Sequence, residues 1–254
     1  MSELLRTENV SEVFGGLKAV TDFNIHLDHG ELVGLIGPNG AGKTTAFNML
    51  TGVYQPTTGT ITFEGESIVG LKPYQVTQRG IARTFQNIRL FSELTVLENV
   101  KIAFHYHVKY GILESVFRIG RYFKEEEAIE EEAHSLLKIF HLDDKADEVA
   151  KNLPYGAQRR LEIARALAAK PKLLLLDEPA AGMNPQETKE LMDMIRWIRQ
   201  EFGLTILLIE HDMSLVMGIC ERIYVLEYGE IIAQGTPDEI KKNPEVIRAY
   251  LGGE

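Results

Sequence analysis

The sequence has one cysteine, no long hydrophobic run and fewer basic than acidic residues. Cys220 cannot form an internal disulfide, and its apolar neighbours in "LVMGIC" predict a small buried side chain in a reducing compartment. Apolar runs such as "LLLL" at 173–176 are far too short to span a bilayer, and the start "MSELLRTENV" lacks the pattern of a signal peptide. A net charge of −10 argues against non-specific coating of nucleic acid, so we expect no nucleic-acid partner.

What is present is the composition of an ordinary folded α/β chain of 254 residues, with 44% hydrophobic residues and no internal repeat. The stretch from about 88 to 160 differs from the rest, because its apolar residues have helical spacing and its "KEEEAIEEEAHSLLKIF" is typical of a solvated helix face. We therefore expect one domain over residues 1–254. Its core would cover about 1–87 and 161–254 and enclose a helical subdomain at about 88–160.

Apolar patterns predict the elements of the core. "DFNIHL" alternates apolar and polar residues, as a strand with one buried face does, whereas "ELVGLI" is nearly all apolar, as a strand buried on both faces is. Asn184 and Thr236 are each followed by a proline and a capping-box acid, so each opens a helix. The patterns predict strands at 22–27, 31–36, 59–65, 173–176 and 205–209, helices at 161–169, 186–202 and 213–219, and two strands around the turn at Tyr228 and Gly229.

A glycine-rich loop follows the strand expected at 31–36. Residues 37–44, "GPNGAGKT", match the spacing G-x-x-x-x-G-K-[ST], in which glycines permit a positive φ and let backbone N–H groups surround phosphate oxygens. Lys43 adds a cation for the β- and γ-phosphates, and the Thr44 hydroxyl is a ligand for Mg²⁺. Because the match follows a buried strand and opens a helix, a phosphate-binding loop is favoured over a structural glycine turn.

Other polar residues are expected at the same edge of the sheet. "KLLLLDEP" is a buried strand that ends in Asp177, expected to hold Mg²⁺ largely through water, and Glu178, expected to orient or deprotonate the attacking water. "TILLIEHD" brings His211 to the same edge, within reach of a γ-phosphate and the water. Gln86, in "ARTFQN", lies where the core passes into the helical segment, and taken alone it is a plain loop glutamine.

Together these motifs resemble one family. The ordered set "GPNGAGKTT", "TFQN", "LPYGAQRR", "LLLLDEP", "AAGMN" and "EHD" looks like the ATP-binding subunit of an ABC transporter, and the resemblance covers essentially the whole chain. It implies an α/β fold with a P-loop NTPase core of mainly parallel sheet, an N-terminal antiparallel β subdomain and an inserted helical subdomain. It also implies ATPase activity, with ATP and Mg²⁺ as cofactors.

The resemblance implies roles for single residues. Phe14, in "VFGGLKAV", takes the place of the aromatic residue that stacks on adenine, and Gln86 that of the glutamine that touches Mg²⁺ and water and senses the membrane partner. Glu178 is similar to the catalytic glutamate and His211 to the switch histidine. The residues implied to bind ATP are Phe14, Gly37, Pro38, Asn39, Gly40, Ala41, Gly42, Lys43, Thr44, Thr45, Gln86, Tyr155, Gly156 and Ala157, and those implied to bind Mg²⁺ are Thr44, Gln86 and Asp177.

The resemblance also implies an assembly. In the family, two subunits close head-to-tail over two ATP molecules, and each ATP lies between the phosphate loop of one subunit and the signature stretch of the other. The signature here is 153–157, in which Pro154 replaces the usual serine. Within the family, "IARTFQNIRLFSELTVLENV" and a long insertion around 105–130 look most like the longer of the two ATPase subunits of branched-chain amino-acid importers. This implies a second ATPase subunit in a heterodimer, two permease subunits, an indirect link to a substrate-binding protein, and a peripheral position at the cytoplasmic face of the cell membrane.

Three other classes of protein share parts of this pattern. A lipopolysaccharide-export ATPase has a similar core, and the identity of the membrane partner separates it from an importer. A soluble ABC protein of translation or DNA repair carries two ATPase domains or a long coiled coil, whereas this chain has one phosphate loop and no sustained heptads. A P-loop kinase has no use for the signature stretch or for His211.

Overall fold

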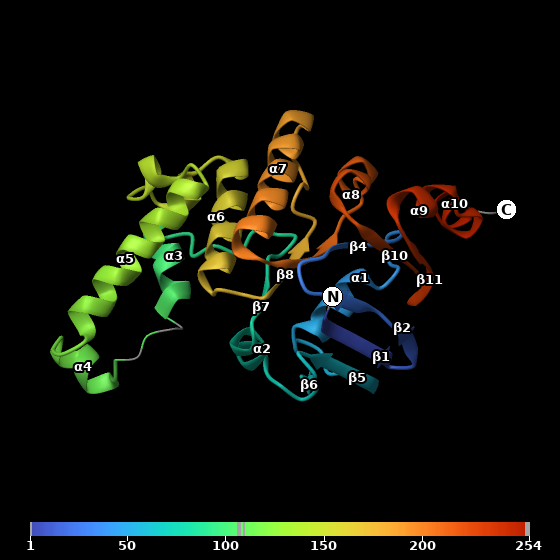
Figure 1. The fold of residues 1–254 in the computed structure, drawn as a ribbon, viewed down its shortest axis with the longest axis horizontal. Coiled ribbons are helices and arrows are strands. Elements are labelled where there is room, and N and C mark those ends of the chain that lie inside the picture. Colours follow the sequence, from blue (N-terminus) through green and yellow to red (C-terminus); the bar gives the residue numbers. More distant parts are fainter. Residues whose placement is uncertain (1, 106–107, 109, 252–254) are drawn as a thin grey trace. The chain divides into compact units, whose positions relative to one another are not determined.

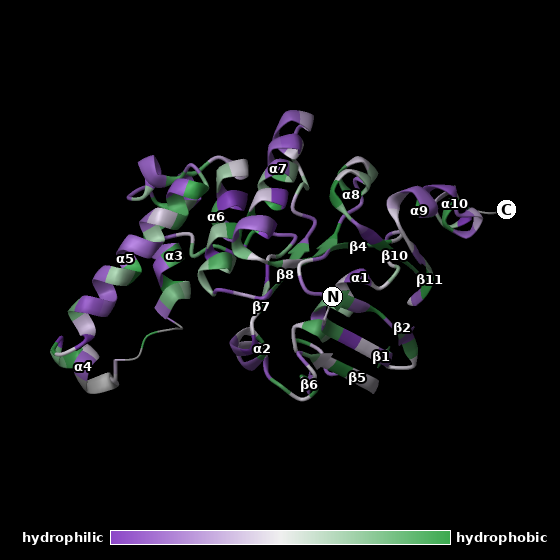
Figure 2. Ribbon diagram, viewed as in Figure 1, coloured by the Kyte–Doolittle hydropathy of each residue, from purple (hydrophilic) through white to green (hydrophobic). Residues whose placement is uncertain are grey.

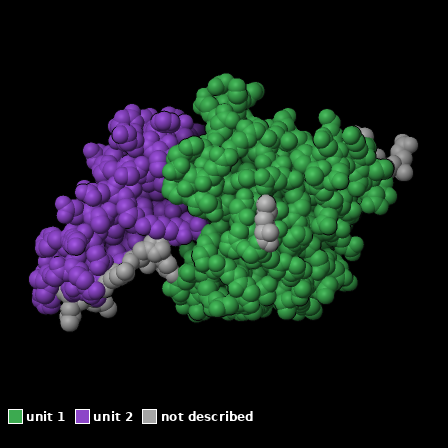
Figure 3. All heavy atoms as spheres, viewed as in Figure 1, with its two compact units in different colours: residues 1–86, 172–254 green, residues 87–171 purple. Residues whose placement is uncertain are grey.

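The computed structural model describes residues 2–105, 108 and 110–251, and the chain divides into two compact units (Figure 3). One unit consists of residues 1–86 and 172–254, and the other of residues 87–171. The second boundary lies later than the expected return to the core near 161, because the helix that ends at Ala168 packs against other helices of the second unit. Residues 1 and 252–254 of the expected domain, and 106, 107 and 109 of the expected insertion, lie outside the described residues.

The larger unit is built around a mainly parallel sheet. Its strands are β4 (Leu32–Ile36), β7 (Ile81–Arg83), β8 (Leu173–Asp177), β9 (Thr205–Ile209), β10 (Arg222–Glu227) and β11 (Glu230–Gly235). They lie in the order β11-β10-β4-β9-β8-β7 (Figure 1), and every neighbouring pair is parallel except the hairpin of β10 and β11. All residues of β4, β8 and β9 are buried, as their continuous apolar runs predicted.

Helices cover both faces of this sheet. They are α1 (Lys43–Leu50), α2 (Pro73–Arg79), α7 (Pro185–Phe202), α8 (Met213–Ile219), α9 (Pro237–Lys242) and α10 (Pro244–Leu251). In Figure 1, α7 and α8 lie on one side of the sheet and α1 on the other, and Figure 2 shows the strands between them in hydrophobic colours. Adjacent residues of β4 face opposite sides: Leu35 shares a core with Phe47 of α1, whereas a side chain at Gly34 would meet Val216 of α8.

The chain ends in two short helices where one was expected. Thr236 and Glu239 form the predicted capping box at the start of α9. The helix then stops at Asn243, whose side chain accepts a hydrogen bond from the Glu245 N–H at 2.9 Å, and Pro244 begins α10. A proline that follows an N-cap residue starts a new helix rather than continuing the old one.

An antiparallel sheet is formed by the N-terminal segment. Its strands are β1 (Glu3–Phe14), β2 (Leu17–Phe23), β3 (His26–Asp28), β5 (Thr58–Phe63) and β6 (Glu66–Ser67). They lie in the order β2-β1-β5-β6, and β3 also pairs with β1. The single strand expected over 22–27 was wrong. The chain turns there because Asp22 has a φ of +44° and the Asn24 side-chain amide donates to the Asp22 carbonyl at 2.7 Å.

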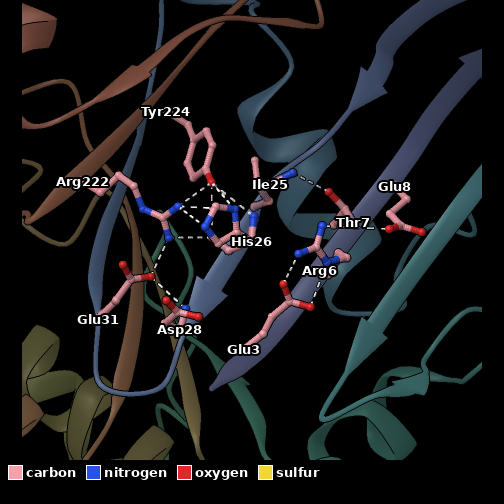
Figure 4. Close-up of polar contacts among 10 residues, drawn as sticks. All are labelled: Glu3, Arg6, Thr7, Glu8, Ile25, His26, Asp28, Glu31, Arg222 and Tyr224. Atoms are coloured by element: carbon pink, nitrogen blue, oxygen red, sulfur yellow. Dashed lines mark hydrogen bonds and ion pairs between the residues drawn. The ribbon is translucent and has the colours of Figure 1, made fainter. Parts of the chain in front are cut away.

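A polar network links the start of β10 to β3 (Figure 4). Arg222 donates to the Glu31 carboxylate at 2.6 Å and to the His26 carbonyl at 2.9 Å, and the His26 N–H donates to the Tyr224 hydroxyl at 3.2 Å. Beside it lies a surface pocket of about 390 Å³ lined by Arg6, Thr7, Glu8, Asn9, Asn24, Ile25 and His26. Arg6 is bound by the carboxylates of Glu3 and Glu8. The charged side chains here pair with one another, so the network links β10 to β3. It contains no residue of the phosphate loop.

The second unit is helical, as its spacing predicted. Its helices are α3 (Val96–Phe104), α4 (Ile112–Phe117), α5 (Tyr122–Ile139) and α6 (Tyr155–Ala168), with single 3₁₀ turns at Asp143–Lys145 and Ala150–Asn152. The buried residues of α5 form one stripe along the helix, and none of them is a glutamate. They are Ile129, Ala133, Leu136 and Leu137. None of the helices formed by the described residues is long and apolar enough to cross a bilayer.

Candidate active site

The phosphate loop joins the buried strand β4 to α1. Gly37 and Gly42 have φ values of +156° and +103°, which favour glycine. A Cβ at Gly37 would lie 2.0 Å from the Leu226 carbonyl oxygen, and one at Gly42 would lie 2.6 Å from the Ala19 carbonyl oxygen. Neither backbone oxygen can move away cheaply, so the path of the loop requires glycine at both ends.

Lys43, the first residue of α1, is folded back onto this loop. Its ammonium donates to the carbonyls of Gly37 at 2.7 Å and Pro38 at 2.9 Å. Burial lowers the pKa of Lys43, and the nearby carboxylates of Glu178 and Asp177 oppose that shift. The cation therefore lies among the loop carbonyls and within the field of Glu178, the predicted catalytic acid, and of Asp177, the predicted Mg²⁺ ligand.

The other predicted residues of the loop differ in exposure. Asn39, Gly40 and Thr44 are exposed, Pro38, Gly42 and Thr45 are half-buried, and Ala41 is buried. The Ala41 carbonyl accepts a hydrogen bond from the Gly229 N–H at 2.9 Å, which ties the loop to the hairpin of β10 and β11. Phe14, at the end of β1, is 43% exposed, and its ring lies 5.2 Å from the ring of Tyr54 in a T-shaped arrangement.

Asp177 ends β8 and is paired with Arg83, the last residue of the neighbouring strand β7. Arg83 Nη2 lies 2.6 Å from Asp177 Oδ2, and the two side chains are only 6% and 5% exposed. Arg83 Nη1 also donates to Asn48 Oδ1 on α1 at 2.6 Å, and the guanidinium lies 5.0 Å from the centre of the Phe85 ring. Arg83 was not predicted from the sequence, although a basic residue stands directly before "TFQN".

The three remaining predicted residues of this unit meet at one carboxylate oxygen. Gln86 Nε2 donates to Glu178 Oε2 at 2.8 Å, and His211 Nδ1 lies 3.6 Å from the same oxygen. Glu178 has a φ of +46°, and its N–H donates to the Ile209 carbonyl of β9 at 2.9 Å. The Glu178 backbone is therefore held in a left-handed conformation that few residues adopt, as often occurs at functional sites.

Two further contacts at the site were missed. Glu210, between β9 and His211, is 1% exposed and accepts backbone hydrogen bonds from Ala180 and His211. The Gly37 N–H donates a hydrogen bond to the Tyr250 hydroxyl of α10, and burial raises the pKa of that hydroxyl. Only Glu210 had a signal in the sequence, as an acid at the end of a wholly apolar strand.

The signature residues belong to the helical unit, whereas all other predicted site residues belong to the larger unit. Helix α6 begins at Tyr155, with Pro154 as its N-cap residue, so the expected start at 161 was too late. As the first two residues of the helix, Tyr155 and Gly156 have N–H groups without an intrahelical acceptor. The Ala157 N–H donates to the Pro154 carbonyl at 3.0 Å.

A buried ion pair of the same unit contacts the first residue of α6. Arg159 Nη1 lies 2.8 Å from Glu162 Oε2, and the two side chains are 0% and 1% exposed. Arg159 also donates to the Tyr155 hydroxyl at 3.3 Å, and Glu162 Oε1 accepts a hydrogen bond from the Arg89 N–H at 3.1 Å. These contacts connect the signature to the segment that follows Gln86 in the sequence.

Comparison with known proteins supplies the family. Residues 20–181 match the family model of the ABC transporter, and residues 230–254 match that of the branched-chain amino acid ATP-binding cassette transporter. The high-affinity branched-chain amino acid transport ATP-binding protein LivG of Escherichia coli is 49% identical over 98% of this chain and of its own. The lipopolysaccharide export system ATP-binding protein LptB of Haemophilus influenzae is 36% identical over 98% of this chain and 97% of its own.

A solved structure agrees with these matches. The crystal structure of the ADP conformation of MJ1267, an ATP-binding cassette of an ABC transporter, is 34% identical, covers 100% of both chains and superimposes with a TM-score of 0.86. The expected fold class, ATP binding and ATPase activity are thereby confirmed, and the family implies permease partners. The chain belongs to the ABC transporter family, as an ATP-binding ATPase subunit of the branched-chain amino-acid type.

Proposed function

We propose that this chain hydrolyses ATP to drive the uptake of branched-chain amino acids through a membrane permease. The observation that carries the hydrolytic role is the meeting of Gln86 and His211 at the Glu178 carboxylate. The transported substrate is supported by the 49% identity to a branched-chain amino-acid transport protein, against 36% to a lipopolysaccharide-export protein.

The residues present fit Mg²⁺ as a cofactor. A magnesium site needs one or two carboxylates together with neutral and phosphate oxygens. Asp177 supplies the carboxylate, and the Thr44 hydroxyl and the Gln86 amide supply neutral oxygens. When bound, Mg²⁺ neutralises charge on the β- and γ-phosphates. The Arg83 guanidinium fixes Asp177 at the end of β8, so this carboxylate is ordered before any cation arrives.

The side chains of the loop and of the strand ends divide the remaining work. Lys43 exchanges its carbonyl contacts for phosphate oxygens, and Phe14 stacks on adenine. Glu178 orients the attacking water and accepts its proton. Gln86 and His211 both contact Oε2 of Glu178, which restrains this carboxylate.

A second ATPase subunit completes the nucleotide site in this proposal. The free N–H groups at the start of α6 and the positive end of the helix dipole suit an anion. That anion is the γ-phosphate of the ATP held by the partner, and the partner is a different, shorter subunit. The assembly further contains two permease subunits, receives substrate from a binding protein, and places this chain peripherally at the cytoplasmic face of the membrane.

The test combines uptake with chemistry. Cells that lack this chain are complemented with the wild type or with Glu178→Gln, and uptake of labelled leucine is compared with that of labelled lysine. We expect wild type to restore leucine uptake alone, and the variant to bind ATP but to hydrolyse it at least a thousandfold more slowly, because about 4 kcal/mol of barrier lowering is lost. Restored lipopolysaccharide export without leucine uptake would refute the substrate, and rapid hydrolysis by the variant would refute the role of Glu178.

A further inference from the structure

Glu210 is a buried carboxylate between two loops of the site. It follows the last residue of β9, is 1% exposed, and is not among the residues that the family motifs identify as contacting ATP or Mg²⁺. Burial raises the pKa of its carboxyl group, while hydrogen bonds from three backbone N–H groups oppose that shift. A carboxylate this buried is destabilising unless its hydrogen bonds compensate for the lost solvent, so its partners indicate what it is for.

The two carboxylate oxygens bind different segments of the chain. Oε1 accepts from the Ala180 N–H at 2.8 Å, two residues after Glu178. Oε2 accepts from the His211 N–H at 3.1 Å and from the Asp212 N–H at 3.4 Å. One side chain therefore joins the segment after β8, which carries Glu178, to the segment after β9, which carries His211.

The sheet register explains why this link is short. β8 and β9 are parallel neighbours, and Asp177 pairs with Ile209, so Glu178 and Glu210 are the residues directly after the two strands. The Glu178 N–H still binds the Ile209 carbonyl at 2.9 Å, after which the two segments separate. Glu210 bridges them where strand pairing ends.

We propose that Glu210 is a positioning residue for ATP hydrolysis, which sets the His211 imidazole at its distance from the Glu178 carboxylate by binding the backbone of both segments. The proposal rests on the roles of Glu178 and His211 given above. Glu210 does not touch the reacting atoms itself. It acts through the 3.6 Å separation of His211 Nδ1 and Glu178 Oε2.

The chemistry of the bridge requires two acceptors. A carboxylate offers one oxygen to each segment, whereas the amide of Gln offers one oxygen and an NH₂ group. In Glu210→Gln the NH₂ group must face either the Ala180 N–H or the His211 N–H. Two donors cannot form a hydrogen bond, so the segment on that side loses its bond to residue 210. The substitution keeps the size of the side chain, so it tests the bridge without opening a cavity.

The experiment measures ATP hydrolysis by the transporter complex purified through a tag on this chain. We expect Glu210→Gln to lower kcat at least tenfold and to leave the KM for ATP within about twofold, because the phosphate loop is untouched. The control is Glu239→Gln, the same change at an exposed carboxylate that also accepts a backbone N–H, from Thr236 at 2.8 Å. The control should leave kcat unchanged.

A double-mutant cycle separates positioning from a general structural role. Single-turnover hydrolysis is measured for Glu210→Gln, His211→Ala and the double variant. If Glu210 acts by placing the imidazole, its substitution lowers the rate less than twofold once His211 is Ala. Equal losses in both backgrounds would overturn the proposal, and so would an unchanged kcat in Glu210→Gln.

Two further variants keep each outcome interpretable. Should Glu210→Gln fail to fold, the same cycle is run with Glu210→Asp, which keeps two oxygens on a shorter side chain and should lose kcat in the same His211-dependent way. Glu178→Gln is measured beside them. If it hydrolyses ATP as wild type does, the role of Glu178 on which this proposal rests has failed; if it is inactive while Glu210→Gln is normal, only the role of Glu210 has failed.

Discussion

Replacing Arg83 by Ala tests how the acid that ends β8 is held. In the wild type, Arg83 and Asp177 are 2.6 Å apart with 6% and 5% of their side chains exposed, so neither charge is solvated. Removing one partner of a buried pair leaves the other charge uncompensated, which destabilises a protein by about 3–5 kcal/mol. That is a large part of the roughly 5–15 kcal/mol by which a folded domain is stable.

The chain offers a matched control. Arg79 forms an ion pair with Glu66, and these side chains are 42% and 66% exposed. Exposed pairs contribute about 0–1 kcal/mol, so Arg79→Ala removes the same kind of side chain with little loss. The difference between the two variants therefore measures burial of the pair rather than loss of an arginine.

Urea unfolding followed by tryptophan fluorescence is the assay. The sequence has one tryptophan, Trp197 on α7, and it belongs to the same unit as Arg83 and Asp177. With a urea dependence of about 3 kcal/mol per molar, Arg83→Ala should lower the midpoint by about 1 M or more. Arg79→Ala should lower it by no more than about 0.3 M.

Removing both charges completes the test. The double variant Arg83→Ala with Asp177→Ala should be more stable than Arg83→Ala alone, because no buried charge is left without a partner. The reasoning is refuted if Arg83→Ala lowers the midpoint no more than Arg79→Ala does, or if the double variant simply adds the two single losses.

Three further outcomes are expected. Lys43→Ala should weaken ATP binding at least tenfold in a fluorescent-nucleotide titration, because charge-assisted hydrogen bonds worth about 1.5–3 kcal/mol are lost; unchanged affinity would mean that the ammonium stays on the loop carbonyls. The Cys220 thiol is 6% exposed and burial raises its pKa, so it should resist a thiol reagent at pH 8 until the protein unfolds, and fast native labelling would contradict its burial. Pro154→Ser should strengthen ATP-dependent closure on the partner's nucleotide by up to about tenfold, measured as site-resolved occupancy, since serine restores a hydroxyl; no change would mean that the proline only starts α6.

Elements bounded by clear signals could be predicted from the sequence. The strand at 205–209 and the helix at 213–219 have the expected bounds, and α7 begins one residue before its predicted start, after the Asn184 cap. The strand is a wholly buried apolar run, and each of the two helices begins after an N-cap residue, Asn184 or Asp212, so the local pattern and the tertiary burial agree.

Elements whose signals are local contacts or mixed polarity were missed. β1 was not predicted, because it is interrupted by register shifts and by Asn9 at a φ of +50°, which break the alternation of exposed and buried residues. The start of α6 was placed too late because its first two turns carry Tyr155 and two arginines. Arg159 among them is nevertheless fully buried, since Glu162 neutralises it.

The site divides in the same way. Gln86, Glu178 and His211 were predicted from motifs, and the structure brings them to one oxygen. Arg83 and Glu210 were not predicted, because no motif assigns them a role, as one does for Asp177, and their purpose shows only through the neighbouring segment that each contacts. Strand order, which the sequence does not display, supplies that information.

The strand order also explains why buried charges lie next to the more exposed side chains of the site. The adjacent strands β7, β8 and β9 end in Arg83 and Asp177 and, one residue past β9, in Glu210, and all three charges are buried and paired or hydrogen-bonded. The groups proposed for chemistry come next along the chain: Gln86 three residues after Arg83, Glu178 directly after Asp177 and His211 directly after Glu210. Buried charges are costly to desolvate and are poor devices for stability alone. Here Arg83 and Asp177 pair across the ends of β7 and β8, and Glu210 binds the backbone N–H groups of Ala180 and His211. The more exposed side chains of Gln86, Glu178 and His211 therefore follow segments of the chain that these contacts hold.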